Sequence, residues 1–114
     1  QNMIIRSWRA IATSQAVIDE YIAHLQATTF REMAALDGNL GASLSKKPVG
    51  DKFELLYLSY WRDMDAVKLF AKGAPLEDAI VKESTQKRLE SYDPKVEYFE
   101  VCASSATLPG QLNN

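Results

Sequence analysis

The chain has 114 residues, of which 46% are hydrophobic and 25% charged, and its formal net charge is −2. These values are typical of one globular domain with a real core, and they give no electrostatic reason to expect nucleic acid or an acidic membrane as a partner. No apolar run approaches the roughly 20 residues that a membrane-spanning helix needs.

The two ends and the cysteine content suggest how the chain is organised. We expect one domain over residues 3–102 and a C-terminal tail over 103–114, which is loose or laid on a partner because it has no periodic pattern. Residues 1–2 precede Met3 and are expected to be an expression remnant. The single cysteine, Cys102, excludes an internal disulfide and favours a reducing cytoplasm.

The N-terminal half predicts a strand followed by helices. Residues 3–12 alternate between two sets, as a strand requires: Ile4, Arg6, Trp8 and Ala10 point one way, and Ile5, Ser7, Arg9 and Ile11 the other. Thr13 or Ser14 can cap a helix that begins near Gln15. Its apolar stripe is Ile18, Tyr21, Ile22 and Leu25. Residues 30–36 continue as a short helical piece that ends at Asp37-Gly38.

The second half predicts a hairpin, two helices and a last strand. Residues 40–46 and 52–60 read as a β-hairpin around a turn at 48–51. Asp63 opens a helix that Gly73 ends, and Pro75 precedes a further helix over 76–89, with a break near Ser84. Residues 96–102 form the last strand. The order β-α-β-β-α-α-β predicts an α+β, ferredoxin-like fold, with a four-stranded antiparallel sheet and helices on one face.

The third strand is apolar on both of its faces. Phe53, Leu55, Tyr57 and Ser59 face one way, and Leu56, Leu58 and Tyr60 the other. An antiparallel sheet with one wet face should instead alternate apolar and polar residues. The helices can cover only one face, so we expect a copy of the same sheet to cover the other in a homodimer. The alternative is a monomer whose tail crosses the sheet.

The segment FELLYLSYWRDMDAVKLFAKG, residues 53–73, resembles the antibiotic biosynthesis monooxygenase family. In that family an apolar third strand ends in a tryptophan and is followed by a short helix with an alanine and an aromatic residue. Weaker similarity covers most of residues 3–102. The resemblance implies a dimeric α/β barrel and a range of activities that includes quinol and anthrone monooxygenases and haem-degrading enzymes.

The family's working residues carry over only in part. The anthrone-type oxygenases have an asparagine four residues before the tryptophan and a tyrosine six residues after it, where this chain has Tyr57 and Val67. In the haem-degrading branch, the asparagine, second tryptophan and histidine fall here on Trp8, Phe70 and roughly Ala79 or Ile80. The haem-degrading hypothesis is therefore disfavoured.

Several residues are candidates for a site, each with a structural alternative. Trp61 could stack a flat substrate or close the core, and Trp8 could line a pocket or pack beneath the first helix. Arg6 could pair with a phenolate or carboxylate, or be an exposed strand-end arginine. His24 is the natural proton acceptor, or a boundary residue of its helix.

The remaining candidates are aromatic or sulfur-containing. Tyr57 could hydrogen-bond a substrate oxygen or belong to the sheet core, and Tyr21 and Phe70 are expected among the substrate-binding residues. Cys102 is expected to be a small buried apolar residue rather than a nucleophile.

The sequence offers no sign of a metal or cofactor site. It contains no histidine or cysteine pair at metal spacing and no glycine-rich phosphate loop. The resemblance to the antibiotic biosynthesis monooxygenase family implies a cofactor-independent monooxygenase for a small aromatic or quinol-like substrate, and we expect His24 and Trp61 to be catalytic. The alternative is a non-catalytic binder of a small apolar ligand on the same scaffold.

Overall fold

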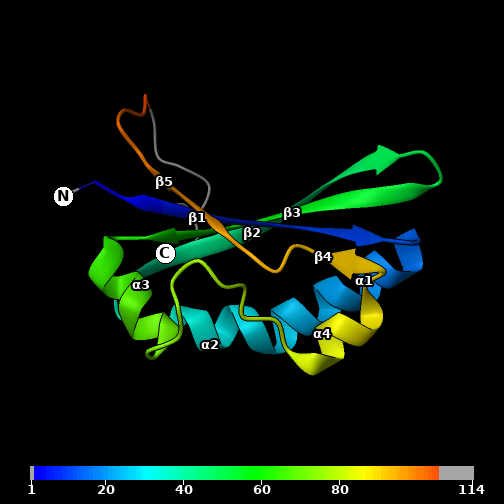
Figure 1. Ribbon diagram of the computed structural model, residues 1–114, viewed down its shortest axis with the longest axis horizontal. Helices are drawn as coiled ribbons and strands as arrows, with labels where there is room; N and C mark the ends of the chain where they lie inside the picture. Colours follow the sequence, from blue (N-terminus) through cyan, green and yellow to red (C-terminus); the bar gives the residue numbers. More distant parts are fainter. Residues whose placement is uncertain (1, 106–114) are drawn as a thin grey trace.

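The computed structural model describes residues 2–105 and contains one antiparallel sheet. Its strands are β1 (Ile4–Ala12), β2 (Asn39–Val49), β3 (Lys52–Trp61), β4 (Ser91–Tyr92) and β5 (Glu97–Glu100). Their order is β2-β3-β1-β4, and β5 also pairs with β1 (Figure 1). The predicted α+β, ferredoxin-like fold is confirmed, with the last strand divided into two short pieces.

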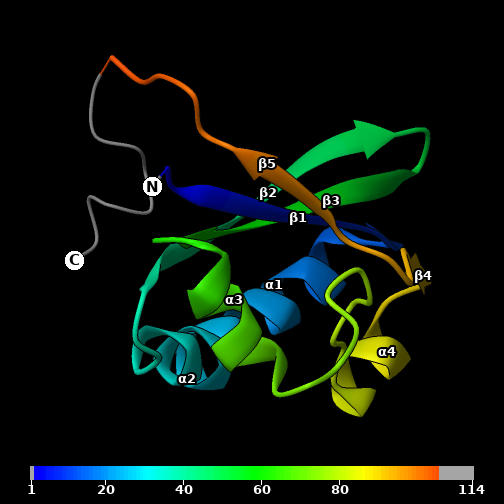
Figure 2. The same cartoon turned by 60° about the vertical axis from the view of Figure 1, so that its left-hand side comes forward.

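The helices all lie on one side of the sheet (Figures 1 and 2). They are α1 (Gln15–His24), the π-helical segment η1 (Leu25–Thr29), α2 (Phe30–Ala34), α3 (Met64–Ala71) and α4 (Glu83–Arg88). Within residues 2–105 no helix is long and apolar enough to cross a membrane.

The first helix begins at the predicted cap. The Ser14 hydroxyl accepts a hydrogen bond from the Val17 amide at 3.3 Å, and the side chains of Ile18, Tyr21 and Leu25 are buried against the sheet. The sequence does not predict that η1 joins α1 directly to α2 through a π-helical turn. Such turns are rare, and they leave no mark in the spacing of the apolar residues.

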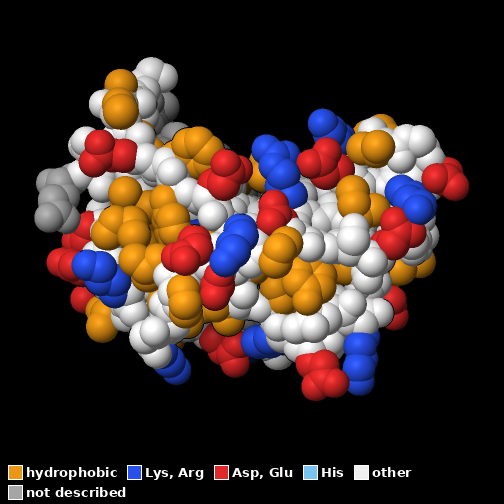
Figure 3. Space-filling view, in the orientation of Figure 1, with side chains coloured by type: hydrophobic (Ala, Val, Ile, Leu, Met, Phe, Trp, Pro, Cys, Tyr) orange, Lys and Arg blue, Asp and Glu red, His pale blue; other side chains and the backbone are white. Residues whose placement is uncertain are grey.

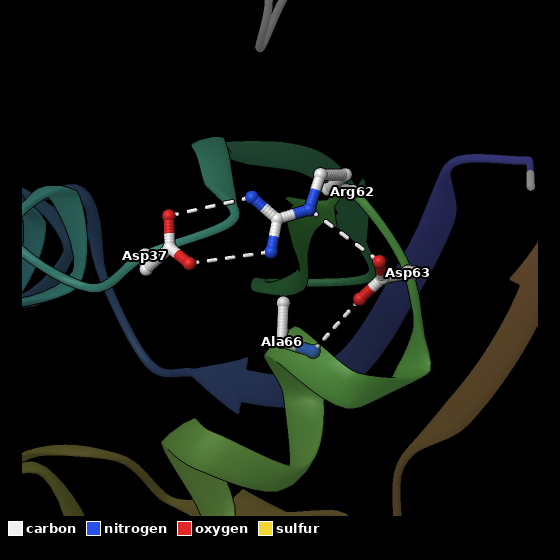
Figure 4. Close-up of polar contacts among 4 residues, drawn as sticks. All are labelled: Asp37, Arg62, Asp63 and Ala66. Atoms are coloured by element: carbon white, nitrogen blue, oxygen red, sulfur yellow. Dashed lines mark hydrogen bonds and ion pairs between the residues drawn. The ribbon is translucent and has the colours of Figure 1, made fainter.

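A cluster of charged residues ties the start of α3 to the turn after α2 (Figure 4). Both terminal nitrogens of Arg62 lie 3.3 Å from the Asp37 carboxylate, and the Asp63 side chain accepts a hydrogen bond from the Ala66 amide at 2.9 Å. Gly38 passes so close to α3 that a Cβ placed there would lie 2.5 Å from the Cβ of Ala66. This turn therefore needs glycine both for space and for its φ of +84°.

The register of β1 on β3 divides the sheet into the two predicted faces. Trp8 lies opposite Tyr57 and Ile4 opposite Trp61, and these four side chains belong to the core beneath the helices. On the other face Ile5 lies opposite Tyr60, and Leu56 and Leu58 are only half-buried. We call this second surface, which also carries the exposed Phe99, the open face. It is concave between the segment after β5 and the β2–β3 hairpin (Figures 1 and 3).

The helix predicted over 76–89 is wrong for its first half. Only Glu83–Arg88 is helical, and residues 74–82 form a non-helical connection, with a turn at residues 76–77, that we call the strap. The Ala79 amide donates to the Pro94 carbonyl at 2.9 Å, and the Val96 amide donates to the Glu77 carbonyl at 2.8 Å. These long-range hydrogen bonds replace the helical ones, so tertiary pairing overrides the local pattern.

The C-terminal predictions need two further corrections. The last strand ends at Glu100 rather than at residue 102, and Cys102 is exposed rather than buried because it lies beyond the pairing with β1. Most of the predicted tail, residues 106–114, lies outside the described residues.

Candidate functional site

Three of the predicted site residues meet between β1 and α3. The guanidinium carbon of Arg6 lies 5.1 Å from the centroid of the Phe70 ring, and that ring lies 5.2 Å from the ring of Trp61. Trp61 is fully buried, and its indole N–H donates to the Ser59 hydroxyl at 2.9 Å. The prediction that Arg6 is exposed is wrong, because only 7% of its surface remains accessible.

Two buried tyrosines extend this group toward the first helix. The Tyr57 hydroxyl donates to the Met33 sulfur at 3.2 Å, and the Tyr57 ring stacks on Phe30 with centroids 6.4 Å apart. Burial raises the pKa of Tyr57 above its usual value, helped by nearby Tyr21 and opposed by Arg6. Burial also raises the pKa of Tyr21, to about 12. Both hydroxyls are therefore neutral donors at physiological pH.

We refer to Arg6, Tyr21, Tyr57, Trp61 and Phe70 as the aromatic cluster. Its members come from β1, α1, β3 and α3, so the sheet and the helices contribute jointly. Aromatic faces, two hydroxyl donors and one cation suit a flat ligand that carries an oxygen substituent.

Trp8 lies next to this cluster but makes its polar contact elsewhere. Its indole N–H donates to the Asp93 carbonyl at 2.7 Å, and its ring lies 6.1 Å from that of Tyr92. Trp8 thus packs against the segment around β4, a position that differs from the expected packing beneath the first helix.

His24 lies apart from these contacts. It ends α1, and its ring lies 3.4 Å from the Thr28 hydroxyl, which donates a hydrogen bond to the His24 carbonyl at 2.8 Å. The Glu32 carboxylate accepts a hydrogen bond from Lys82 at 2.7 Å, and this bond is the main cause that lowers the pKa of Glu32. These contacts place His24 at the boundary of its helix.

A pocket of about 340 Å³ lies between the strap, α4 and residues 92–95. Its lining residues are Asp78, Ala79, Val81, Gln86, Tyr92, Pro94 and Lys95. Tyr92 links this pocket to Trp8, and the Asp78 backbone links it to Arg6. The pocket therefore borders residues that contact Arg6 and Trp8, while its lining residues include no member of the aromatic cluster.

Three residues around Arg6 and Tyr57 escaped the sequence analysis. The Tyr98 hydroxyl accepts from Arg6 Nε at 3.2 Å, the Asp78 carbonyl accepts from Arg6 Nη2 at 3.2 Å, and Met33 is the acceptor for Tyr57. Pairing of the last strand with β1 could have placed Tyr98 opposite Arg6. No sequence signal points to a backbone carbonyl such as that of Asp78.

The described part of the chain holds no group of three or more His, Cys, Asp or Glu side chains that could bind a metal ion.

Comparison with solved structures shows that other proteins share this fold. A candidate antibiotic biosynthesis monooxygenase from Bacillus cereus is 14% identical, with a TM-score of 0.62 over 94% of this chain and 100% of its own. A dimeric ferredoxin-like protein from an uncultured marine organism is 16% identical, with a TM-score of 0.64 over 91% of this chain and 99% of its own.

A third similar structure is SnoaB, a cofactor-independent oxygenase from Streptomyces nogalater. It is 16% identical, with a TM-score of 0.54 over 96% of this chain and 99% of its own. No protein-family model and no curated protein matches the sequence. The fold expected from the family resemblance is therefore confirmed, while its chemistry must be argued from the residues.

Proposed function

We propose that this chain is a cofactor-independent monooxygenase for a small aromatic or quinol-like substrate. The observation that carries the proposal is the aromatic cluster, in which Arg6 lies against Phe70 and Phe70 against Trp61 between the sheet and the helices. The fold is shared with SnoaB, a cofactor-independent oxygenase, which supports the same assignment.

The proposed reaction uses the substrate as its own reductant. Removal of a proton from an activated phenol or methylene leaves an electron-rich carbanion, which donates electrons to O2. For a methylene, one oxygen atom replaces the two hydrogens as a carbonyl and the other leaves as water, so R2CH2 and O2 give R2CO and H2O. The protein then has to supply orientation, a dry site and a proton acceptor.

The residues divide these tasks. Trp61 and Phe70 provide flat faces for the substrate ring, while Arg6 and the two tyrosines face its oxygen. His24 is the proposed proton acceptor, and it lies three residues beyond Tyr21, one turn along the same helix. Trp8, on β1 next to the aromatic cluster, forms one side of the proposed substrate site.

We also propose that the chain forms a homodimer through the open face. That face exposes Phe99 to 54% and leaves Leu56 and Leu58 half-buried, whereas the opposite face is covered by helices. A large apolar sheet face is seldom left exposed to water, and the same face of a second copy can cover it in a symmetric dimer. The similar structure of a dimeric ferredoxin-like protein supports a homodimer. A cytoplasmic location is proposed from the single cysteine.

A second function, non-catalytic binding of a small apolar ligand, is favoured by two observations. Tyr57 and Val67 occupy the places of the asparagine and tyrosine used by anthrone-type oxygenases. The described hydrogen bonds of His24 also run to Thr28 rather than to the aromatic cluster. A binder would hold its ligand at the aromatic cluster without converting it into a product.

Oxygen uptake separates the two functions. We expect the purified chain to consume O2 with an anthrone or a quinol, and His24→Gln to slow this at least about tenfold if His24 accepts the proton. Trp61→Phe should mainly raise KM, while Gln26→Ala, an exposed change near His24, should leave the rate unchanged. Uptake that is unaffected in a combined His24→Gln and Trp61→Phe variant would contradict the assignment. Thermal stabilisation by the ligand without uptake would support the binder.

A further inference from the structure

Arg6 is a buried cation whose described partners are all neutral. Its Nε donates to the Tyr98 hydroxyl and its Nη2 to the Asp78 carbonyl, both at 3.2 Å, and its guanidinium carbon lies over the Phe70 ring. Among the ion pairs of residues 2–105, none includes Arg6. By contrast Arg9, on the other side of the same strand, is exposed and pairs with Glu54 at 3.1 Å.

Burying an unpaired guanidinium in this position is unfavourable for the free energy of folding. Arginine stays protonated in proteins, so it cannot escape burial by losing its proton. Carbonyl and hydroxyl dipoles and an aromatic face replace part of its hydration, but they leave the full charge uncompensated. Arg6 would therefore attract an anion strongly.

The described groups around Arg6 do not neutralise its charge. Asp78 offers only its main-chain oxygen, because its carboxylate is paired with the Lys95 ammonium group at 2.5 Å. Tyr98 donates its own proton to the Leu76 carbonyl at 2.5 Å, and its oxygen accepts from Arg6. Tyr57 is neutral, and its hydroxyl donates only to the Met33 sulfur, a weak acceptor that an anionic oxygen would readily replace.

The strap supplies the acceptor that a ligand would displace from Arg6, the Asp78 carbonyl. It joins α3 to α4 below the sheet, and it is held at Leu76 by Tyr98 and at Asp78 by Arg6 (Figure 2). Its other anchors, at Glu77 and Ala79, run to the main chain of residues 94–96 and do not involve Arg6. The strap can therefore lose its bond to Arg6 while remaining attached.

We propose that Arg6 binds the ionised oxygen of a small aromatic ligand, a phenolate or an aromatic carboxylate, in exchange for the Asp78 carbonyl, with the ligand ring against Phe70 and Trp61. The inference rests on the proposed function and narrows its substrate class to acidic aromatic compounds that bind as anions. A charge-assisted bond to guanidinium is stronger than the neutral bond it replaces, so the exchange favours the ligand.

Two pairs of probes test this without any turnover. The phenolate arm compares 4-nitrophenol, whose anion and neutral form differ in absorbance, with 4-nitroanisole, which cannot ionise. The carboxylate arm compares 2-naphthoate with 2-naphthamide by calorimetry. The variant is Arg6→Met, and Arg9→Met is the matched control because Arg9 is an exposed arginine on the same strand.

The wild-type chain should prefer the charged member of at least one pair by about tenfold or more, which for nitrophenol appears as a pKa lowered by about one unit on binding. Arg6→Met should abolish this preference and keep the affinity for the neutral probe within about twofold, while Arg9→Met should behave as wild type. If Arg6→Met fails to fold, Arg6→Lys should retain part of the preference because it keeps the charge but loses the planar fork.

The proposal is overturned if the neutral probes bind as well as the anions, if the preference survives Arg6→Met, or if none of the four probes binds. These outcomes are independent of oxygen uptake. An Arg6-dependent preference without uptake would keep this inference and remove the monooxygenase, and uptake without the preference would do the reverse.

Discussion

Arg6 on β1 and Phe70 on α3 are in face-on contact, with 5.1 Å between the guanidinium carbon and the ring centroid. The two residues lie far apart in the sequence. They meet because β1 pairs with β3, and α3 directly follows β3. Their contact fixes a cation at the junction of the sheet and helix layers. It also places that cation beside Trp61, which lies 5.2 Å from Phe70.

If Arg6 serves a ligand rather than the fold, its replacement should cost little stability. We expect Arg6→Met to change the free energy of unfolding by no more than about 1 kcal/mol, because relief from burying an unpaired charge offsets the lost hydrogen bonds and cation–π contact. Urea unfolding measures this. A loss of about 3 kcal/mol or more would show that Arg6 is needed to hold the strap.

Gly38→Ala should be among the most damaging substitutions of a surface turn. The added Cβ would lie 2.5 Å from the Cβ of Ala66, at a φ of +84°. We expect a loss of about 3 kcal/mol or more, seen as a lower Tm. The matched control is Gly50→Ala, where φ is +62° but nothing lies within 4 Å, and which should cost only about 1 kcal/mol. Equal losses would mean that the close approach to α3 is unimportant.

The buried tyrosines predict a loss of stability at alkaline pH. Burial raises the pKa of Tyr21 from 10.0 to about 12, and it also raises that of Tyr57. The unfolded chain therefore loses these protons first, so their contribution is intact below pH 10 and declines as the pH rises toward 12 and beyond. For Tyr21 alone the decline is roughly 2–3 kcal/mol.

Chemical unfolding at a series of pH values, followed by tyrosinate absorbance, checks this decline. Tyr21→Phe should flatten it, whereas Tyr92→Phe, which alters a half-buried tyrosine outside the aromatic cluster, should leave it unchanged. A stability that stays level from pH 9 to 12 would rule out the buried, neutral state of these hydroxyls.

The proposed dimer predicts that one charge on the open face separates the subunits. Leu58→Glu should turn a dimer into a monomer in analytical ultracentrifugation, because the charge would have to be buried against the partner sheet. Leu69→Glu provides the control, since Leu69 is 58% exposed on α3, on the helix side of the sheet. A wild-type monomer, or dimers of both variants, would contradict the proposed interface.

The sequence predicted those features that depend on local spacing. The two faces of β1 and β3 follow from alternation, and the caps Ser14 and Asp63 follow from their hydroxyl and carboxylate groups. The strap was missed because its backbone bonds go to residues 94–96, while its own sequence has a helix-like pattern. Arg6 was misjudged for a similar reason, since the Tyr98 hydroxyl that it contacts lies 92 positions further along the chain.

The central claim is that the chain inserts one atom of O2 into a small aromatic substrate, and labelled oxygen tests it most directly. The purified chain, treated with a chelator to remove metal ions, should convert an anthrone under 18O2 to a product with one 18O atom in its new carbonyl group. The second 18O atom should be released as water. Product whose new oxygen comes from the solvent would contradict the account. Conversion of the anthrone no faster than its uncatalysed oxidation would also contradict it.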